Sequence, residues 1–171
     1  MGRGPTQSIR VAIFALALLV TLAVGCGDDN SGGEPPGGRG ARVERFGTEA
    51  SGRQARRIES NLRNYVDARS TGAWKRACSY LTTQSRDLLS RFSSRSSRAA
   101  SGGCVAGLAS VTGQLSAPER AELAVAGVVS VRVDGVDGYA IYETPRGGRY
   151  AMAVQREAGR WAVDGSALPL D

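Results

Sequence analysis

The 171-residue chain contains no histidine. Histidine is the commonest general base at neutral pH and the commonest metal ligand, so its absence removes the most frequent designs of catalytic and metal sites. The sequence also lacks a glycine-rich phosphate loop before a helix and a Gly-x-Ser-x-Gly nucleophile motif. We therefore predict that the chain is not an enzyme and holds neither a metal nor a cofactor.

Lysine is almost absent, since Lys75 is the only lysine among the 22 basic residues. The chain also has 16 acidic residues, so its net charge is +6. The positive charge is concentrated in residues 39–98, which contain fourteen basic and five acidic residues. No nucleic-acid recognition motif accompanies it, so we expect no nucleic-acid partner. The basic stretch instead predicts contact with anionic lipid head groups.

No hydrophobic run is long enough to favour a permanent membrane span. The longest, residues 11–24, has neither charge nor proline, but as a helix it is about 21 Å long, whereas a span needs roughly 20 residues. It follows a segment carrying Arg3 and Arg10 and ends in small residues. This order is typical of a secretory signal peptide, which we assign to residues 1–25.

The signal peptide is followed directly by Cys26. The sequence Leu22-Ala23-Val24-Gly25-Cys26 resembles the lipobox of bacterial lipoproteins, with alanine at the position where leucine is commonest. The resemblance implies cleavage before Cys26, diacylglycerol on its sulfur and an acyl chain such as palmitate on its amine. The mature chain would then be anchored to the extracytoplasmic face of the cell membrane, since two or more acyl chains make attachment stable. A plain secreted protein cleaved after the same small residues is the alternative.

Two further cysteines, Cys78 and Cys104, remain once Cys26 is assigned to lipid. An oxidising compartment favours a disulfide bond between them, and two buried free thiols are the alternative.

Residues 27–40 contain six glycines, two prolines and no large apolar residue. This composition predicts a disordered linker, which we extend over residues 26–46, followed by one domain over residues 47–171.

Apolar residues first recur with helical spacing. Four helices are predicted: one from a capping box at Ser51 and Gln54 to about Arg69, a short one next, one after a cap at Thr82 and Thr83, and one after a loop at residues 93–103. Their inward positions are Ala55, Ile58, Leu62, Tyr65 and Val66; Trp74, Ala77, Cys78 and Leu81; Leu88, Leu89 and Phe92; and Cys104, Leu108, Val111 and Leu115.

From residue 123 the apolar period changes to two, which predicts four antiparallel strands near residues 124–133, 139–144, 149–157 and 160–164. If Ala158 and Gly159 form a two-residue turn, Arg156 lies opposite Trp161 and Val154 opposite Val163. The predicted fold class is therefore α+β, with the N-terminal helices packed on a curved four-stranded antiparallel sheet.

Besides this order of helices and strands, four sequence features support a resemblance to a known superfamily. They are Tyr65-Val66-Asp67-Ala68, Trp74-Lys75-Arg76-Ala77-Cys78-Ser79-Tyr80-Leu81, the distal Cys104, and Arg156-Glu157-Ala158-Gly159-Arg160-Trp161-Ala162-Val163-Asp164. Over residues 48–165 the chain resembles the nuclear transport factor 2-like superfamily, and more narrowly the secreted actinobacterial lipoproteins with that cystatin-like cone. It departs from them in lacking a strand hairpin between the second and third helices. The superfamily includes isomerases, dehydratases and non-catalytic binding modules, so the fold alone selects no function.

Candidate pocket or core-edge residues are Tyr65, Trp74, Tyr142, Arg156 and Trp161. We predict no catalytic residue, and we expect a non-catalytic domain that binds an unknown small ligand or an envelope protein.

The alternative is a cavity-based isomerase or dehydratase of the ketosteroid isomerase-like type, which needs an apolar cavity, a carboxylate base and a hydroxyl donor. Donors are available in Tyr80, Tyr139, Tyr142 and Tyr150. The carboxylates of Asp134, Asp137 and Asp164 are expected at turns or strand ends, in solvent. A deep pocket with a carboxylate beside a tyrosine hydroxyl would favour the enzyme; a filled core with an apolar patch on the sheet would favour an interaction module.

Overall fold

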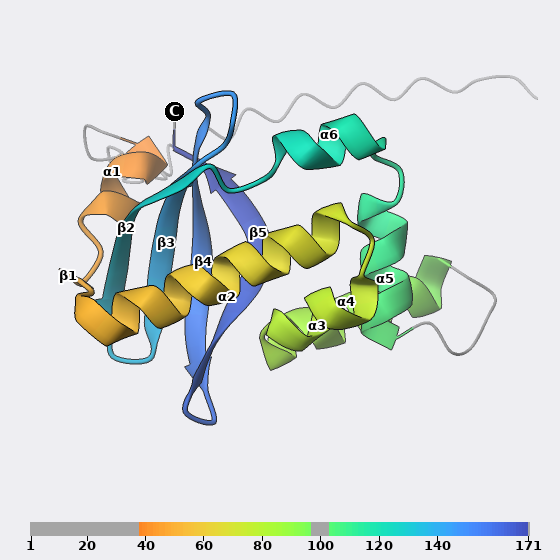
Figure 1. Cartoon of the computed structure of the whole chain (residues 1–171). Helices are drawn as coiled ribbons and strands as arrows, with labels where there is room; N and C mark the ends of the chain where they lie inside the picture. Colours follow the sequence, from red (N-terminus) through yellow and green to blue (C-terminus); the bar gives the residue numbers. More distant parts are fainter. Residues whose placement is uncertain (1–37, 97–102, 171) are drawn as a thin grey trace, which may run out of the picture. The chain divides into compact units, whose positions relative to one another are not determined.

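The computed structural model of the chain describes residues 38–96 and 103–170 (Figure 1). The predicted signal peptide, Cys26 and most of the predicted linker lie outside the described residues. The elements are α1 (Gly38–Glu44), β1 (Thr48–Glu49), α2 (Gly52–Ser70), α3 (Trp74–Tyr80), α4 (Thr83–Ser96), α5 (Gly103–Thr112), α6 (Ala117–Glu122), β2 (Gly127–Asp134), β3 (Asp137–Glu143), β4 (Arg149–Glu157) and β5 (Arg160–Pro169). The α+β class is confirmed.

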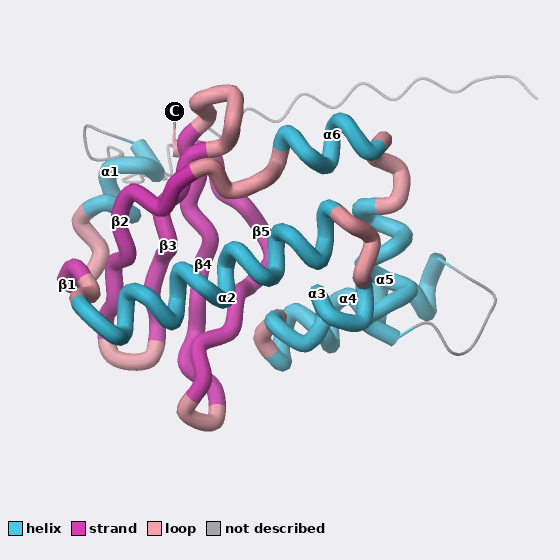
Figure 2. The backbone as a smooth tube through the Cα atoms, viewed as in Figure 1, coloured by secondary structure: helices cyan, strands magenta, loops and turns pink. Residues whose placement is uncertain are grey.

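The sheet has five strands in the order β1-β2-β3-β4-β5, and every neighbouring pair is antiparallel (Figure 2). The prediction of four strands is therefore wrong by one. The extra strand, β1, is two residues long and pairs Thr48 with Val133. Two residues are too few to show an alternating pattern, so this strand has no signal in the sequence.

The hairpin between β4 and β5 has the predicted register. Arg156 pairs with Trp161, and Val154 pairs with Val163. The φ angles of Ala158 and Gly159 are +46° and +79°, as a two-residue turn with both central residues at positive φ requires. The predicted turn is confirmed.

Beyond this hairpin, β5 contains a β-bulge and continues further than predicted. Val154 pairs with Val163, but Met152 pairs with Ala167 rather than with Gly165. Gly165 has a φ of +86°, a conformation that glycine adopts without steric cost. The strand was predicted to end near residue 164. Gly165 and Ser166 lie in the bulge, and the strand runs on to Pro169.

Helix α2 crosses one face of the sheet and forms the core with it (Figure 1). The predicted stripe of α2 is confirmed, since Ile58 and Leu62 have no exposed surface and Tyr65 is 1% exposed. Complete burial of such a side chain stabilises the fold by about 1.5 to 3 kcal/mol. The facing residues on the sheet are Val131, Val133, Ala140, Tyr142, Met152, Val154, Trp161 and Val163.

The opposite face of the sheet packs against α1. The composition predicts that residues 38–46 belong to the disordered linker, but residues Gly38–Glu44 form a helix. Val43 is 5% exposed and packs with Ile141 and Ala151. One buried valine among glycine and arginine produces no periodic signal, which explains why the helix was not predicted.

Helices α3, α4 and α5 gather beyond the β5 edge of the sheet (Figure 2). The Sγ atoms of Cys78 in α3 and Cys104 in α5 lie 2.04 Å apart, so the predicted disulfide bond joins these helices. For a loop of this length, the chain-entropy model gives a stabilisation of about 3 to 4 kcal/mol.

Two predicted caps have different outcomes. The predicted box at Ser51 is absent, because Ser51 makes no side-chain capping bond at the start of α2. The cap at Thr82 is confirmed, because its Oγ1 accepts a hydrogen bond from the Ser85 backbone N–H at 3.2 Å. Helix α4 extends to Ser96, four residues into the predicted loop, and residues 97–102 lie outside the described residues.

Candidate functional site

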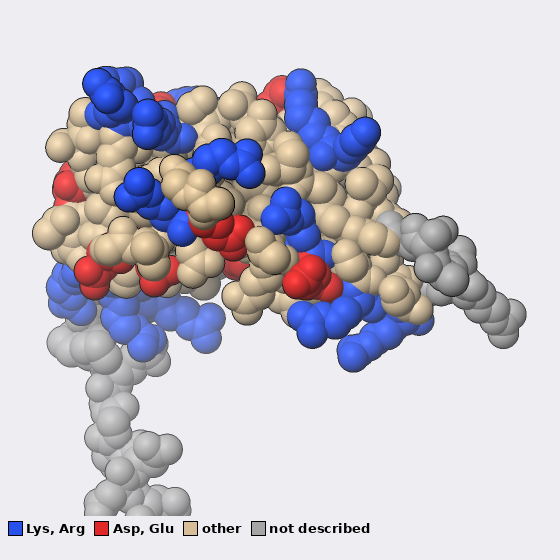
Figure 3. Space-filling model, turned by 90° about the horizontal axis from the view of Figure 1, so that it is seen from below, with Lys and Arg blue, Asp and Glu red and all other residues tan. Residues whose placement is uncertain are grey.

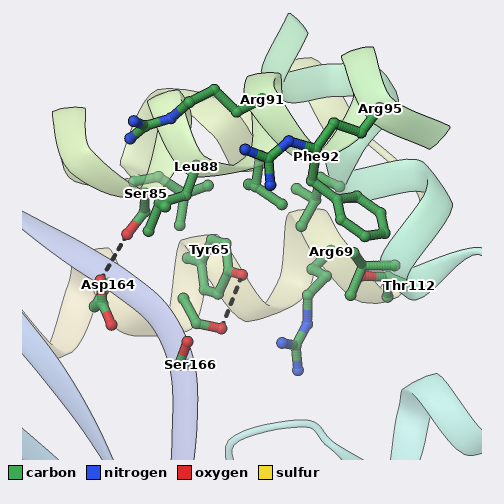
Figure 4. A pocket seen from close by; sticks show the side chains of 15 residues that line it. Tyr65, Arg69, Ser85, Leu88, Arg91, Phe92, Arg95, Thr112, Asp164 and Ser166 are labelled. Carbon is green, nitrogen blue, oxygen red and sulfur yellow. Dashed lines mark hydrogen bonds between the residues drawn. The ribbon is translucent and has the colours of Figure 1, made fainter. Parts of the chain in front are cut away.

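A cavity of about 550 Å³ lies between α2, α4, α5 and the bulge of β5 (Figure 4). Its volume is within the range of about 300 to 1,000 Å³ that is typical of small-molecule sites. The bulge supplies one side of the cavity, because Gly165 and Ser166 leave the regular pairing of β5 there. The apolar lining consists of Leu81, Leu88, Leu89, Phe92, Leu108 and Val111.

Some of these apolar side chains are exposed. The helical spacing predicts that Leu88, Phe92 and Val111 lie on inward helical faces, but Leu88 is 53%, Phe92 46% and Val111 55% exposed. All three line the cavity, so the helical period was predicted correctly and the burial was not. Apolar groups exposed around a concave site are typical of ligand binding.

One side of the cavity carries polar groups (Figure 4). The hydroxyl of Ser85 donates a hydrogen bond to Asp164 Oδ1 at 2.6 Å, and the hydroxyl of Thr82 donates to Ser85 at 2.9 Å. Asp164 was predicted at a strand end in solvent. It lies instead within β5 beside the bulge, where it is partly buried and lines the cavity. This correction follows from the unpredicted length of β5.

Gly165 is a point of close approach between β5 and α2. The hydroxyl of Tyr65 donates a hydrogen bond to the Gly165 carbonyl at 3.4 Å. A Cβ at position 165 would lie 2.7 Å from Leu81 Cδ2 and 3.0 Å from the Tyr65 hydroxyl. Both the positive φ and the lack of space therefore require glycine here.

Two buried tyrosines remain protonated at neutral pH. Burial raises the pKa of the Tyr65 hydroxyl, although the positive charge of Arg69 opposes this effect. Burial also raises the pKa of Tyr142 to about 12. Arg69 lies over the Tyr65 ring, with its guanidinium carbon 5.5 Å from the ring centre. At neutral pH, Tyr65 therefore presents a hydroxyl, never a phenolate, next to the cavity.

Arginine provides most of the charge around the cavity. Arg69 comes from α2 and Arg91 and Arg95 come from α4, whereas Asp164 is the one carboxylate in the lining. Within residues 38–96 and 103–170, none of these three arginines forms an ion pair with a carboxylate. Other arginines of the described chain do so, for example Arg63 with Glu59 and Arg76 with Asp67. The cavity therefore has an excess of positive charge.

The five candidate residues from the sequence do not form one site. Only Tyr65 lines this cavity, whereas Tyr142 is buried in the core and 2% exposed. Trp74 lines a separate shallow pocket with Val105. Arg156 is exposed, and Trp161 lies mostly buried beside a polar pocket near the β4–β5 turn.

The residues that sequence reasoning missed include Arg91 and Arg95. Their signal was present in α4, where Leu88, Arg91, Phe92 and Arg95 recur at helical spacing and so share one face. Asp164 and Ser85 carried no comparable signal, because their contact joins residues far apart in the chain.

The part of the chain that the structure describes holds no cluster of three or more cysteine, aspartate or glutamate side chains suited to a metal ion. Among its helices, none has both the length and the hydropathy needed to cross a bilayer. Searches against protein-family models, curated proteins and solved structures find no match to this chain.

Alkaline pH should destabilise the fold through Tyr142. Its pKa of about 12 in the folded state exceeds the ordinary value of 10.0, so the stability it contributes is complete below pH 10 and is lost as the pH rises toward 12. The free energy of unfolding should fall by up to about 1.4 kcal/mol per pH unit in this range. Urea unfolding between pH 9 and 11.5 measures this slope. Tyr142→Phe should have a smaller slope, and equal slopes would contradict the assignment.

Proposed function

We propose that the mature chain is a lipid-anchored extracytoplasmic lipoprotein whose domain binds the apolar part of a small ligand in the cavity between α2, α4, α5 and β5. The observation that carries this proposal is the exposure of Leu88, Phe92 and Val111 around a cavity of about 550 Å³. An interaction module would show a filled core and an apolar patch on the sheet instead. Among the residues that the structure describes, the other exposed large apolar ones are Val105, Val129 and Val136, which lie outside the cavity lining.

The anchoring part of the proposal is supported by the sequence around Cys26 and by the Cys78–Cys104 disulfide bond. Disulfide bonds persist mainly in oxidising compartments outside the cytoplasm. The finer fold assignment, a cone of the nuclear transport factor 2-like type, belongs to the same proposal. It is supported by the order of helices before strands and by the position of α2 across the sheet.

Anionic lipid head groups remain a second proposed partner of the basic surface. On the face that Figure 3 shows, Lys and Arg side chains lie at several separate places with Asp and Glu between them. Such a distribution provides weaker attraction to a membrane than one continuous basic patch, because exposed charges are screened beyond about 10 Å at 0.1 M salt. The acyl chains on Cys26 are therefore expected to dominate attachment.

The anchor can be tested by replacing Cys26. In a bacterial host that processes lipoproteins, the unaltered chain should partition into Triton X-114, and mass spectrometry should find diacylglycerol on an N-terminal Cys26. Cys26→Ser removes the acylated sulfur and should move the protein to the aqueous phase, whereas the control Ser31→Ala should not. A mature chain that begins at another residue, or that keeps its leader, would refute the anchor.

The cavity can be tested with a neutral apolar dye, N-phenyl-1-naphthylamine, and the chain from Gly27 onward. Replacement of both Leu88 and Val111 by glutamine places polar groups in the lining and should raise the dissociation constant about tenfold, as expected for the loss of two partly buried apolar contacts.

The matched control replaces Val129 and Val136 by glutamine, which changes surface hydropathy by a similar amount away from the cavity. Its dye fluorescence should equal that of the unaltered chain. Equal binding by both double variants would show that the dye binds elsewhere and would contradict the proposed site.

A cavity-based isomerase or dehydratase is the second candidate, because Asp164 and Tyr65 both line the cavity. Asp164 would remove the proton between the carbonyl group and the double bond of a β,γ-unsaturated ketone and return it to the γ carbon, while the Tyr65 hydroxyl stabilises the enolate. We rank it second because Asp164 Oδ1 already accepts the Ser85 hydrogen bond and the carboxylate is only partly buried.

This candidate predicts formation of a conjugated enone, followed by ultraviolet absorbance, and a loss of about 10² to 10⁴ in rate for Asp164→Asn. Leu88→Gln, which alters the apolar wall without removing a proton-transfer group, should mainly raise KM. Absence of turnover for a ketone that demonstrably binds would rule out this isomerisation.

A further inference from the structure

We propose that the ligand is an anionic amphiphile, whose single alkyl chain occupies the apolar cavity and whose carboxylate or phosphate head group binds Arg91 and Arg95. This inference rests on the proposed function and specifies the chemical class of the ligand. It follows from the arrangement of charge around the apolar lining.

Helix α4 presents apolar and positive groups on the same face. Leu88, Arg91, Phe92 and Arg95 are spaced by three and four residues and all line the cavity. In Figure 4, Arg91 and Arg95 extend along the α4 side of the cavity beside Leu88 and Phe92, while Asp164 lies on the β5 side. A ligand that contacts this face meets an apolar wall and two guanidinium groups together.

The guanidinium groups have capacity for an anion. Arg91 Nε donates to the Asp87 carbonyl at a long 3.4 Å, which leaves its terminal N–H groups available. Neither Arg91 nor Arg95 is ion-paired with a carboxylate in the described residues. A planar guanidinium binds a carboxylate or phosphate through paired hydrogen bonds, so this head-group chemistry matches the site.

The remaining charged groups do not cancel this attraction. Asp164 accepts the Ser85 hydrogen bond on the β5 side, and Arg69 lies over the Tyr65 ring. The three arginines and one aspartate of the lining leave two positive charges in excess. A neutral ligand would use the apolar wall alone, and a cationic one would be repelled.

A membrane surface is the less suitable occupant. Contact with a bilayer would need a flat or convex apolar face on the protein, whereas Leu88 and Val111 line a cavity with a volume of about 550 Å³. A single-chain carboxylate and a single-chain phosphate share the required chemistry, and separate arms of the experiment distinguish them from a bilayer.

The experiment compares decanoate, decyl phosphate, 1-decanol and decyltrimethylammonium, each below the concentration at which it self-associates. Their dissociation constants are measured by displacement of N-phenyl-1-naphthylamine from the chain beginning at Gly27. The two anions should bind about tenfold more tightly than the alcohol, because hydrogen bonds to charged groups are the strong ones. The cation should bind most weakly.

Replacement of both Arg91 and Arg95 by glutamine should abolish the preference for anions and leave the affinity for 1-decanol within about twofold. The matched control replaces Arg53 and Arg56, exposed residues at the start of α2 outside the cavity lining, and should retain the preference. Lysine at positions 91 and 95 should restore part of it, because the charge returns without the planar fork. Circular dichroism checks that each variant is folded.

An alkyl series from octanoate to dodecanoate tests the position of the chain. Each added methylene should tighten binding about fourfold, the value for transfer of one CH₂ group from water, until the cavity is full.

Equal affinity for decanoate and 1-decanol would refute the binding of an anionic head group but not the binding of an alkyl chain in the apolar cavity. Failure of every amphiphile and of the dye would refute the proposed function as well. Binding to phosphatidylglycerol vesicles without binding of any soluble amphiphile would assign the face to a membrane and overturn the inference.

Discussion

The β-bulge at Gly165 is the constraint on which the cavity depends. A regular β5 would pair Met152 with position 165, whereas the bulge shifts the pairing to Ala167. In the displaced backbone, the Gly165 carbonyl accepts a hydrogen bond from the Tyr65 hydroxyl. This close approach leaves no room for a Cβ between Tyr65 and Leu81. The bulge also places Asp164 against Ser85 of α4. One local departure from sheet geometry thus positions groups from α2, α4 and β5 around the same space.

The helices beyond β5 hold the other side of the cavity open. The Cys78–Cys104 disulfide bond joins α3 to α5, and the segment after α3 is tied to β5 by the hydrogen bond from the Thr82 N–H to the Val163 carbonyl at 2.9 Å. These attachments hold α4 and α5 at the edge of the sheet, so their apolar side chains are not drawn fully into the core. Leu88 and Val111 remain exposed as a result.

The elements that could be predicted have either a periodic apolar pattern or residue types with a specific structural role, and the elements that were missed have neither. The α2 stripe, the disulfide pair and the β4–β5 turn each had a local signal and are confirmed. Helix α1 and strand β1 are short and were missed, and the bulge made β5 longer than its pattern. The cavity brings together residues that are distant in the chain, such as Tyr65 and Asp164, so only three-dimensional structure could reveal it.

An anchor at Cys26 and a cavity for an amphiphile are physically consistent with each other. Residues 27–37 precede α1, and eleven residues span at most about 40 Å even when fully extended. A lipidated Cys26 would therefore confine the domain to a thin layer next to a bilayer, where molecules with one alkyl chain and a charged head are most concentrated. The arginines of α4 would then discriminate among these molecules by head-group charge, since the alkyl chain alone distinguishes them poorly.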